Sequence, residues 1–108
     1  MTAYVIINYL QVSNEEKIRE YRVRAHSLVA SYGGRVITRP GELHALEGAE
    51  SEYLFILEFD DIAAARAWYD SSEYQTARSI RDQHATIQVM IVQGVKEPKA
   101  IRRHRLGE

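Results

Sequence analysis

Two side chains of this sequence have the chemistry of a proton acceptor, Glu58 and His44. Glu58 shares one face of an apolar segment with Leu54 and Ile56, where shielding from water would make its carboxylate a better base. The alternative for Glu58 is a structural ion pair at the sheet edge with an arginine such as Arg39. His44 follows a predicted turn and is either a base at the mouth of a pocket or an exposed loop histidine. Both are candidate catalytic residues, each with a structural alternative.

Three arginines carry the planar guanidinium group that binds a carboxylate or an enolate through paired donors: Arg39, Arg78 and Arg81. Arg78 and Arg81 are three residues apart, which places them about one helical turn from each other. Solvated surface positions are the alternative for all three. Of these, Arg39 and Arg78 are the predicted ligand-binding residues.

Asn8 and three aromatic residues are further candidates for ligand binding. Asn8 is a polar residue within an apolar segment near the N-terminus, where its amide must either bond locally or face a cavity. The aromatic residues lie where two predicted helices meet and are Trp68, Tyr69 and Tyr74. Such side chains belong more often to a core than to a cavity wall, so both interpretations stay open.

The sequence contains no motif that is typical of a metal or cofactor site. It has no cysteine, and His26 and His44 occur without the HxH, HExxH or DxD spacing of metal ligands. We therefore expect neither a metal nor a cofactor.

The hydrophobic pattern predicts the elements that carry these residues. β-branched and aromatic residues indicate strands at 3–10, 35–39, 53–59 and 86–93, with residues 43–46 extending the second strand into a short hairpin. A first helix begins at the capping box of Ser13 and Glu16 and ends at Gly33, and further helices are expected at 62–69 and from about 71 to 83. The order is that of an α+β, ferredoxin-like β-α-β-β-α-β antiparallel sheet with helices on one face.

The first and third predicted strands are apolar on both faces. The alternating sets are Val5, Ile7 and Tyr9 against Tyr4, Ile6 and Leu10, and Leu54 and Ile56 against Phe55, Leu57 and Phe59. Helices on one side can cover only one of these faces, so the other face needs a different cover. The simplest cover is a second copy of the chain, which predicts a homodimer with the two sheets packed face to face.

Several of these segments together resemble the family called domain of unknown function 1330. They are Tyr-Gly-Gly-Arg at 32–35 with the run to Arg39 and Gly41, Leu-Glu-Gly at 46–48, Leu-Glu-Phe at 57–59, and Ala-Ala-Arg-Ala-Trp-Tyr-Asp-Ser-Ser-Glu-Tyr at 64–74. The resemblance covers residues 2–95, and Pro40 departs from it where the family usually has glycine. It implies a dimeric α/β barrel, a superfamily whose ligands usually lie between the sheet and the helices of each subunit.

The wider superfamily contains cofactor-free monooxygenases, isomerases such as muconolactone isomerase, dehydratases and haem-degrading oxygenases. The haem-degrading members use an asparagine on the first strand, a tryptophan on the second helix and, ten residues later, a histidine that binds iron. Asn8 and Trp68 match the first two, but Arg78 stands at the third position and cannot bind iron. His84 comes six residues further on, so the resemblance does not extend to haem.

Length and charge limit the remaining possibilities. At 108 residues the chain has room for one domain, expected at 1–95, followed by a basic and flexible tail at 96–108. Residues 1–95 carry 9 basic and 13 acidic side chains, which argues against a nucleic-acid-binding face, while the tail carries 5 and 2. No signal peptide or membrane span is evident, so we expect a cytoplasmic protein that does not contact a membrane.

These observations predict a cytosolic homodimer that binds a small organic acid or aromatic compound between sheet and helices. A cofactor-free oxygenase or isomerase would use Glu58 or His44 as the base and an arginine to stabilise the anion. Asn8 and Trp68 would position its substrate. The alternatives are a non-catalytic ligand-binding dimer, a structural dimer with a closed core, and a module that binds nucleic acid or another partner through the tail.

Overall fold

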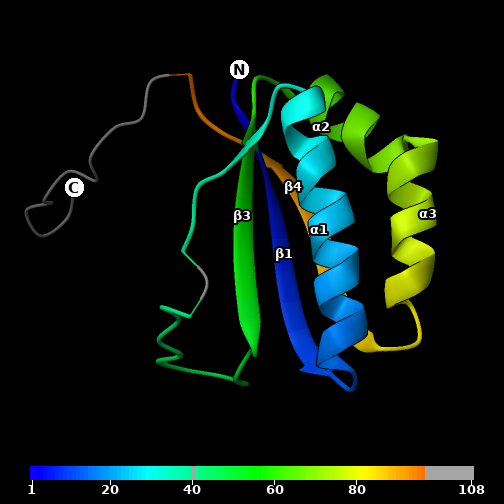
Figure 1. The fold of residues 1–108 in the computed structure, drawn as a ribbon. Coiled ribbons are helices and arrows are strands. Elements are labelled where there is room, and N and C mark those ends of the chain that lie inside the picture. Colours follow the sequence, from blue (N-terminus) through cyan, green and yellow to red (C-terminus); the bar gives the residue numbers. More distant parts are fainter. Residues whose placement is uncertain (40, 97–108) are drawn as a thin grey trace, which may run out of the picture.

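The computed structural model describes residues 1–39 and 41–96 and shows a four-stranded antiparallel sheet with three helices (Figure 1). The elements are β1 (Ala3–Val12), α1 (Glu15–Ser31), β2 (Arg35–Val36), β3 (Tyr53–Phe59), α2 (Ile62–Asp70), α3 (Ser72–Arg81) and β4 (Ala85–Gln93). The α+β, ferredoxin-like order predicted from the sequence is confirmed. Of the predicted flexible tail, all but Lys96 lies outside the described residues, as does Pro40 of the predicted turn.

The strand order across the sheet is β2-β3-β1-β4, so the first strand lies between the third and the fourth. β1 pairs with β3 from Ala3 opposite Phe59 to Tyr9 opposite Tyr53. β1 also pairs with β4, with one register irregularity after Tyr9. β4 therefore forms one edge of the sheet, and the short β2 covers only the end of β3 at the other.

The hydrophobic core lies between the sheet and the helices. Alternate residues of β1 point into it and are fully buried, as the two-residue period of a strand requires. The helices supply a complementary stripe from α1, which includes Ile18, Ala25 and Val29. This burial is the main force that holds α1 against the sheet.

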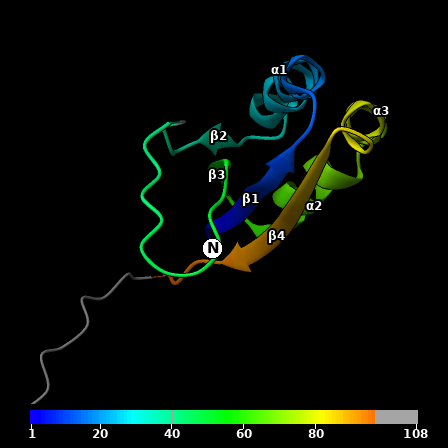
Figure 2. The ribbon, with the colours of Figure 1, turned by 90° about the horizontal axis from the view of Figure 1, so that it is seen from below.

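The opposite face of the sheet has no helix over it in the described part of the chain (Figure 2). It nevertheless carries seven apolar residues. Met90 and Val92 are exposed, and the others are partly buried: Tyr4, Ile6, Leu10, Leu54 and Ile56. We call these seven residues the open face. The prediction that one apolar face stays uncovered by helices is confirmed.

Three local predictions were wrong. Asn14, not Ser13, caps α1: its Oδ1 accepts a hydrogen bond from the Lys17 backbone N–H at 3.1 Å, while the Ser13 hydroxyl donates to the His84 carbonyl at 3.2 Å. Residues 43–46 form no hairpin. β2 ends at Val36, after which the Thr38 hydroxyl, at 3.0 Å, replaces a backbone acceptor for the Ile56 N–H.

The two C-terminal helices are capped largely as their sequence predicts. The Asp61 carboxylate accepts from the Ala64 backbone N–H at 2.8 Å, and the Ser71 hydroxyl accepts from that of Tyr74 at 3.1 Å. The second of these helices ends at Arg81, slightly earlier than predicted. The Asp61 cap fixes the start of α2, which forms one wall of the site described next.

Candidate functional site

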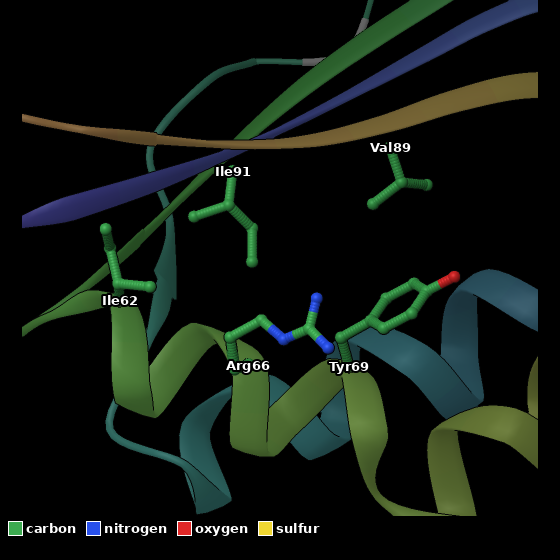
Figure 3. Close-up of a pocket in the computed structure, with 5 residues that line it drawn as sticks. All are labelled: Ile62, Arg66, Tyr69, Val89 and Ile91. Carbon is green, nitrogen blue, oxygen red and sulfur yellow. The ribbon is translucent and has the colours of Figure 1, made fainter.

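An open pocket of 420 Å³ lies between α2 and the edge strand β4, on the helical side of the sheet (Figure 3). We call it the α2–β4 pocket. Ile62, Arg66 and Tyr69 line it from α2, where their spacing of four and three residues puts them on one helical face. Val89 and Ile91 line it from β4, where alternate residues share a face. The walls are thus aliphatic and aromatic, with one cationic group.

Arg66 supplies that cation. Its side chain leaves α2 on the pocket side and runs along the helix, so that the guanidinium lies beside the Tyr69 side chain (Figure 3). Arg66 Nη2 lies 3.2 Å from Asp70 Oδ2, one helical turn further on, and the Arg66 side chain is 59% exposed. This exposed ion pair holds the guanidinium only weakly. An anionic ligand could therefore recruit it.

Tyr69 is held in place by residues of α3. Its hydroxyl accepts a hydrogen bond from Arg78 Nη1 at 3.0 Å, and its backbone carbonyl accepts from Gln75 Nε2 at 2.7 Å. Arg78 Nε also lies 3.6 Å from Asp82. The structure therefore brings together two of the predicted ligand-binding residues, Tyr69 in the pocket wall and Arg78 behind it.

Trp68 and Tyr74 lie in the core behind the pocket. Both are fully buried, and their ring centroids are 4.5 Å apart. Trp68 Nε1 donates to the Ala25 carbonyl at 3.2 Å, which ties α2 to α1. These side chains occupy the core positions that the sequence left as the alternative to a cavity wall.

A buried polar cluster surrounds Tyr74. Its hydroxyl lies 2.9 Å from that of Tyr21, and Arg81 Nη1 donates to it at 3.2 Å. Arg81 is only 7% exposed. Burial raises the pKa of the Tyr21 and Tyr74 hydroxyls, so they stay protonated. Burial by itself would lower the pKa of Arg81, but the neighbouring tyrosine oxygens raise it, and the guanidinium stays charged.

Glu58 lies on the opposite side of the sheet from the α2–β4 pocket. The β2–β3 register sets Arg35 opposite Glu58, and Arg35 Nε donates to Glu58 Oε1 at 2.6 Å. The structural ion pair that the sequence left open therefore exists, but with Arg35 and not with Arg39. Arg35 was missed because strand register is a tertiary property.

His44 and Arg39 lie in the connection between β2 and β3. The His44 side chain is 80% exposed, and its Nε2 lies 3.6 Å from Glu42. Arg39 is exposed too and lines a smaller hollow of 260 Å³ together with Glu42 and Leu54. Neither side chain lines the α2–β4 pocket.

Asn8 points away from the helices. Ile7 and Tyr9 face the core, so strand alternation turns Asn8 toward the open face, where its Nδ2 donates to Gln88 Oε1 at 3.4 Å. Its Oδ1 is buried without a hydrogen-bond partner in the described chain. The predicted joint positioning of a substrate by Asn8 and Trp68 does not fit one subunit, because the two side chains lie on opposite faces of the sheet.

The family model described as "Domain of unknown function (DUF1330)" matches residues 2–95. The chain belongs to the DUF1330 family. A search of curated proteins found no match. In the residues of this DUF1330 protein that the structure describes, no three His, Asp or Glu side chains gather to hold a metal ion. Within the same residues, no helix is long and apolar enough to cross a membrane.

Solved structures with the same fold are only distantly related in sequence. A dimeric ferredoxin-like protein of unknown function from Jannaschia sp. CCS1 is 16% identical, with a TM-score of 0.69 over 87% of this chain and 100% of that one. A protein of unknown function from Rhodopseudomonas palustris is 17% identical, with a TM-score of 0.67 over 89% and 84%. SnoaB, a cofactor-independent oxygenase from Streptomyces nogalater, is 15% identical, with a TM-score of 0.58 over 99% and 97%. These similarities establish the ferredoxin-like fold of the DUF1330 chain.

Of the lining residues of this DUF1330 pocket that the sequence analysis missed, Arg66 is the charged one. It lies within the motif that carries the family resemblance, and its spacing from Ile62 and Tyr69 already placed the three on one helical face. What the sequence did not show is that β4 lies opposite this face, because that depends on the packing of α2 across the sheet edge.

Proposed function

We propose that this protein is a homodimer that binds a small organic acid or aromatic compound in the α2–β4 pocket. The observation that carries the proposal is the position of the Arg66 guanidinium within a wall of aliphatic and aromatic side chains. Sites for small molecules combine such apolar walls with few polar groups, which set orientation and specificity.

The size and chemistry of the pocket limit the ligand. Its volume of 420 Å³ lies toward the lower end of the range of about 300–1,000 Å³ for ligand sites, which suits a compound of one or two rings. The planar donors of Arg66 would bind a carboxylate in a bidentate manner. Tyr69, Val89 and Ile91 would cover the apolar part of the same ligand.

The homodimer is proposed from the open face. Seven largely apolar residues on a sheet face without helices need cover, and a second copy presents the same surface in a symmetric, face-to-face arrangement. The Jannaschia protein of this fold is described as dimeric, which supports the proposal. Two sheets packed in this way would form the dimeric α/β barrel that the family resemblance implies.

Binding is a better-supported function for this pocket than proton transfer. None of its five lining residues is a carboxylate or a histidine, the groups that most often act as a base. SnoaB is described as a cofactor-independent oxygenase, but at 15% identity it shares only the fold with this chain. Oxygenase or isomerase activity with Glu58 or His44 as the base stays a prediction from the sequence.

A titration with small carboxylates, followed by NMR of the Ile62, Val89 and Ile91 methyl groups, tests binding directly. We expect saturable shifts of these methyl signals and a loss of affinity of about tenfold in Arg66→Ala, since one charge-assisted hydrogen-bond pair is removed. Arg24→Ala is the matched control, because Arg24 also sits in an exposed ion pair one turn from its partner, but on α1.

Two results would contradict the proposal. The first is that no carboxylate or aromatic acid shifts the methyl signals of the α2–β4 pocket. The second is that Arg66→Ala and Arg24→Ala bind the ligand equally well.

A further inference from the structure

A second hollow lies at the other edge of the helical layer, between α1 and β3. Its volume is 450 Å³, and we call it the α1–β3 groove; its lining residues are Arg19, Arg22, Val23, His26, Tyr53 and Phe55. β2 pairs with β3 only at Leu57 and Glu58, so it does not extend over this end of β3. Because β3 and β4 lie on opposite sides of β1, the groove is separate from the α2–β4 pocket.

The floor of the groove is aromatic and holds a cation. Arg22 Cζ lies 4.9 Å from the centroid of the Tyr53 ring and 5.7 Å from that of Phe55. Tyr9 extends this floor into the core, edge-on to Tyr53 and Phe55 at 5.9 and 5.8 Å. Cation–π attraction keeps a guanidinium over such a floor. The in-plane donors of a guanidinium remain available to an anion when its face is against a ring.

The cations of the groove are not neutralised by carboxylates in the described chain. Arg19 and Arg22 are three residues apart on α1, and neither is within ion-pair distance of an acidic side chain there. Two acidic residues, Glu15 and Glu52, lie at this end of β3, and Glu15 accepts a hydrogen bond from the Tyr53 hydroxyl at 3.1 Å. A positively charged wall thus faces an aromatic floor.

His26 adds an unsatisfied polar group. It lies one turn after Arg22, and its ring is edge-on to Phe55 at 5.2 Å. Its Nε2 is buried without a hydrogen-bond partner in the residues that the structure describes. Burial, reinforced by the charge of Arg22, lowers the pKa of His26, so the ring is neutral. A buried polar atom of this kind is costly unless a partner is supplied.

We propose that the α1–β3 groove is a binding site for a small hydroxylated aromatic carboxylate. The ligand ring packs against the exposed part of Tyr53 beside the Arg22 guanidinium, and its carboxylate pairs with the guanidinium groups of Arg22 and Arg19. Its hydroxyl group, which can donate or accept, bonds to His26 Nε2 when the His26 ring turns to expose this buried atom to the groove. This assignment is independent of the function proposed for the α2–β4 pocket, since the two sites share no residue.

Titration with 4-hydroxybenzoate, followed through the His26 ring C–H signals, tests the proposal. His26→Gln assigns these signals. We expect a saturable shift of the wild-type His26 signals, and a loss of affinity of about tenfold in Arg22→Gln and in Arg19→Gln. Arg24→Gln, on the same helix but outside the groove, is the matched control and should bind like the wild type. The neutral analogue 4-hydroxybenzamide should not compete.

Thermal unfolding of each variant separates loss of binding from loss of fold. Because Arg19 is exposed, Arg19→Gln should have little effect on the core. Absence of a His26 shift, or wild-type affinity in both Arg19→Gln and Arg22→Gln, would overturn the proposal. Shifts confined to Ile62, Val89 and Ile91 would place the ligand in the α2–β4 pocket, which would overturn the groove site but support the proposed function. If Arg66→Ala loses the shifts of Ile62, Val89 and Ile91 but keeps the His26 shift, the result supports the groove as a separate binding site.

Discussion

Tyr9 and Tyr74 are both buried in the hydrophobic core, but their hydroxyl groups differ in hydrogen bonding. That of Tyr74 lies 2.9 Å from the Tyr21 hydroxyl and accepts a hydrogen bond from Arg81 at 3.2 Å. Tyr9 is also fully buried, but its hydroxyl has no hydrogen-bond partner in the described chain. A satisfied buried hydroxyl stabilises a fold, whereas an unpaired one destabilises it.

We therefore expect opposite effects from the same change at these two positions. Tyr9→Phe should raise the free energy of unfolding by about 1 kcal/mol, because it removes an unpaired polar atom, and Tyr74→Phe should lower it by about 1–2 kcal/mol. Urea denaturation followed by circular dichroism measures both. Destabilisation by Tyr9→Phe as large as that by Tyr74→Phe would show that the Tyr9 hydroxyl has a partner.

The catalytic roles predicted for Glu58 and His44 can be tested separately from binding. Both lie away from the α2–β4 pocket, so Glu58→Gln and His44→Ala should bind a ligand there within about twofold of the wild type. If either residue acts as a base on a bound ligand, its variant loses turnover while it keeps this affinity. Oxygen uptake and NMR of the ligand before and after incubation measure turnover, and unchanged conversion in both variants would exclude both residues as the base.

At the scale of elements, the structure follows the local pattern closely and departs from it where tertiary contacts decide. β3 has its predicted bounds because its apolar alternation is visible in the sequence. The pairing of Glu58 with Arg35, in contrast, depends on the register between two strands, and β2 ends early because Thr38 offers a side-chain acceptor. The groove at His26 was missed because its floor comes from β3, which lies far from α1 in the sequence.

The start of α1 offers a test at this scale. Asn14→Ala should lower the free energy of unfolding by about 1 kcal/mol, because the cap on the Lys17 N–H is lost. Ser13→Ala should cost less, since Ser13 does not cap the helix and only its exposed bond to the His84 carbonyl is removed. Denaturant titrations of the two variants compare them, and a larger effect at Ser13 would restore the capping box predicted from the sequence.

At the scale of the whole molecule, the helices lie on one side of the sheet (Figure 2), and the other side carries the apolar residues of the open face. Two polar pairs accompany the open face on this side of the sheet, Asn8 with Gln88 and Glu58 with Arg35. The unpaired Oδ1 of Asn8 lies at the centre of this surface, between β3 and β4. A second copy that covers this surface would shield the two polar pairs from water, as the Asn8 Oδ1 is already shielded within one subunit.

A charge on the open face should therefore prevent dimerisation. Ile6→Lys places an ammonium group in the centre of the proposed interface, where burying it without a partner costs several kcal/mol. Leu46→Lys is the matched control, because Leu46 is 90% exposed in the connection between β2 and β3. Sedimentation should give a monomer for the first variant and a dimer for the second, and a dimer for both would place the interface elsewhere.

Native mass spectrometry of the protein as purified from cells tests the central claim most directly. A homodimer with a releasable small molecule would show both assembly and binding in one spectrum, and we predict this species. The released mass should correspond to an organic acid or an aromatic compound. A monomer at micromolar concentration would contradict the dimer, and a bare dimer that takes up no carboxylate or aromatic acid on incubation would contradict the binding function.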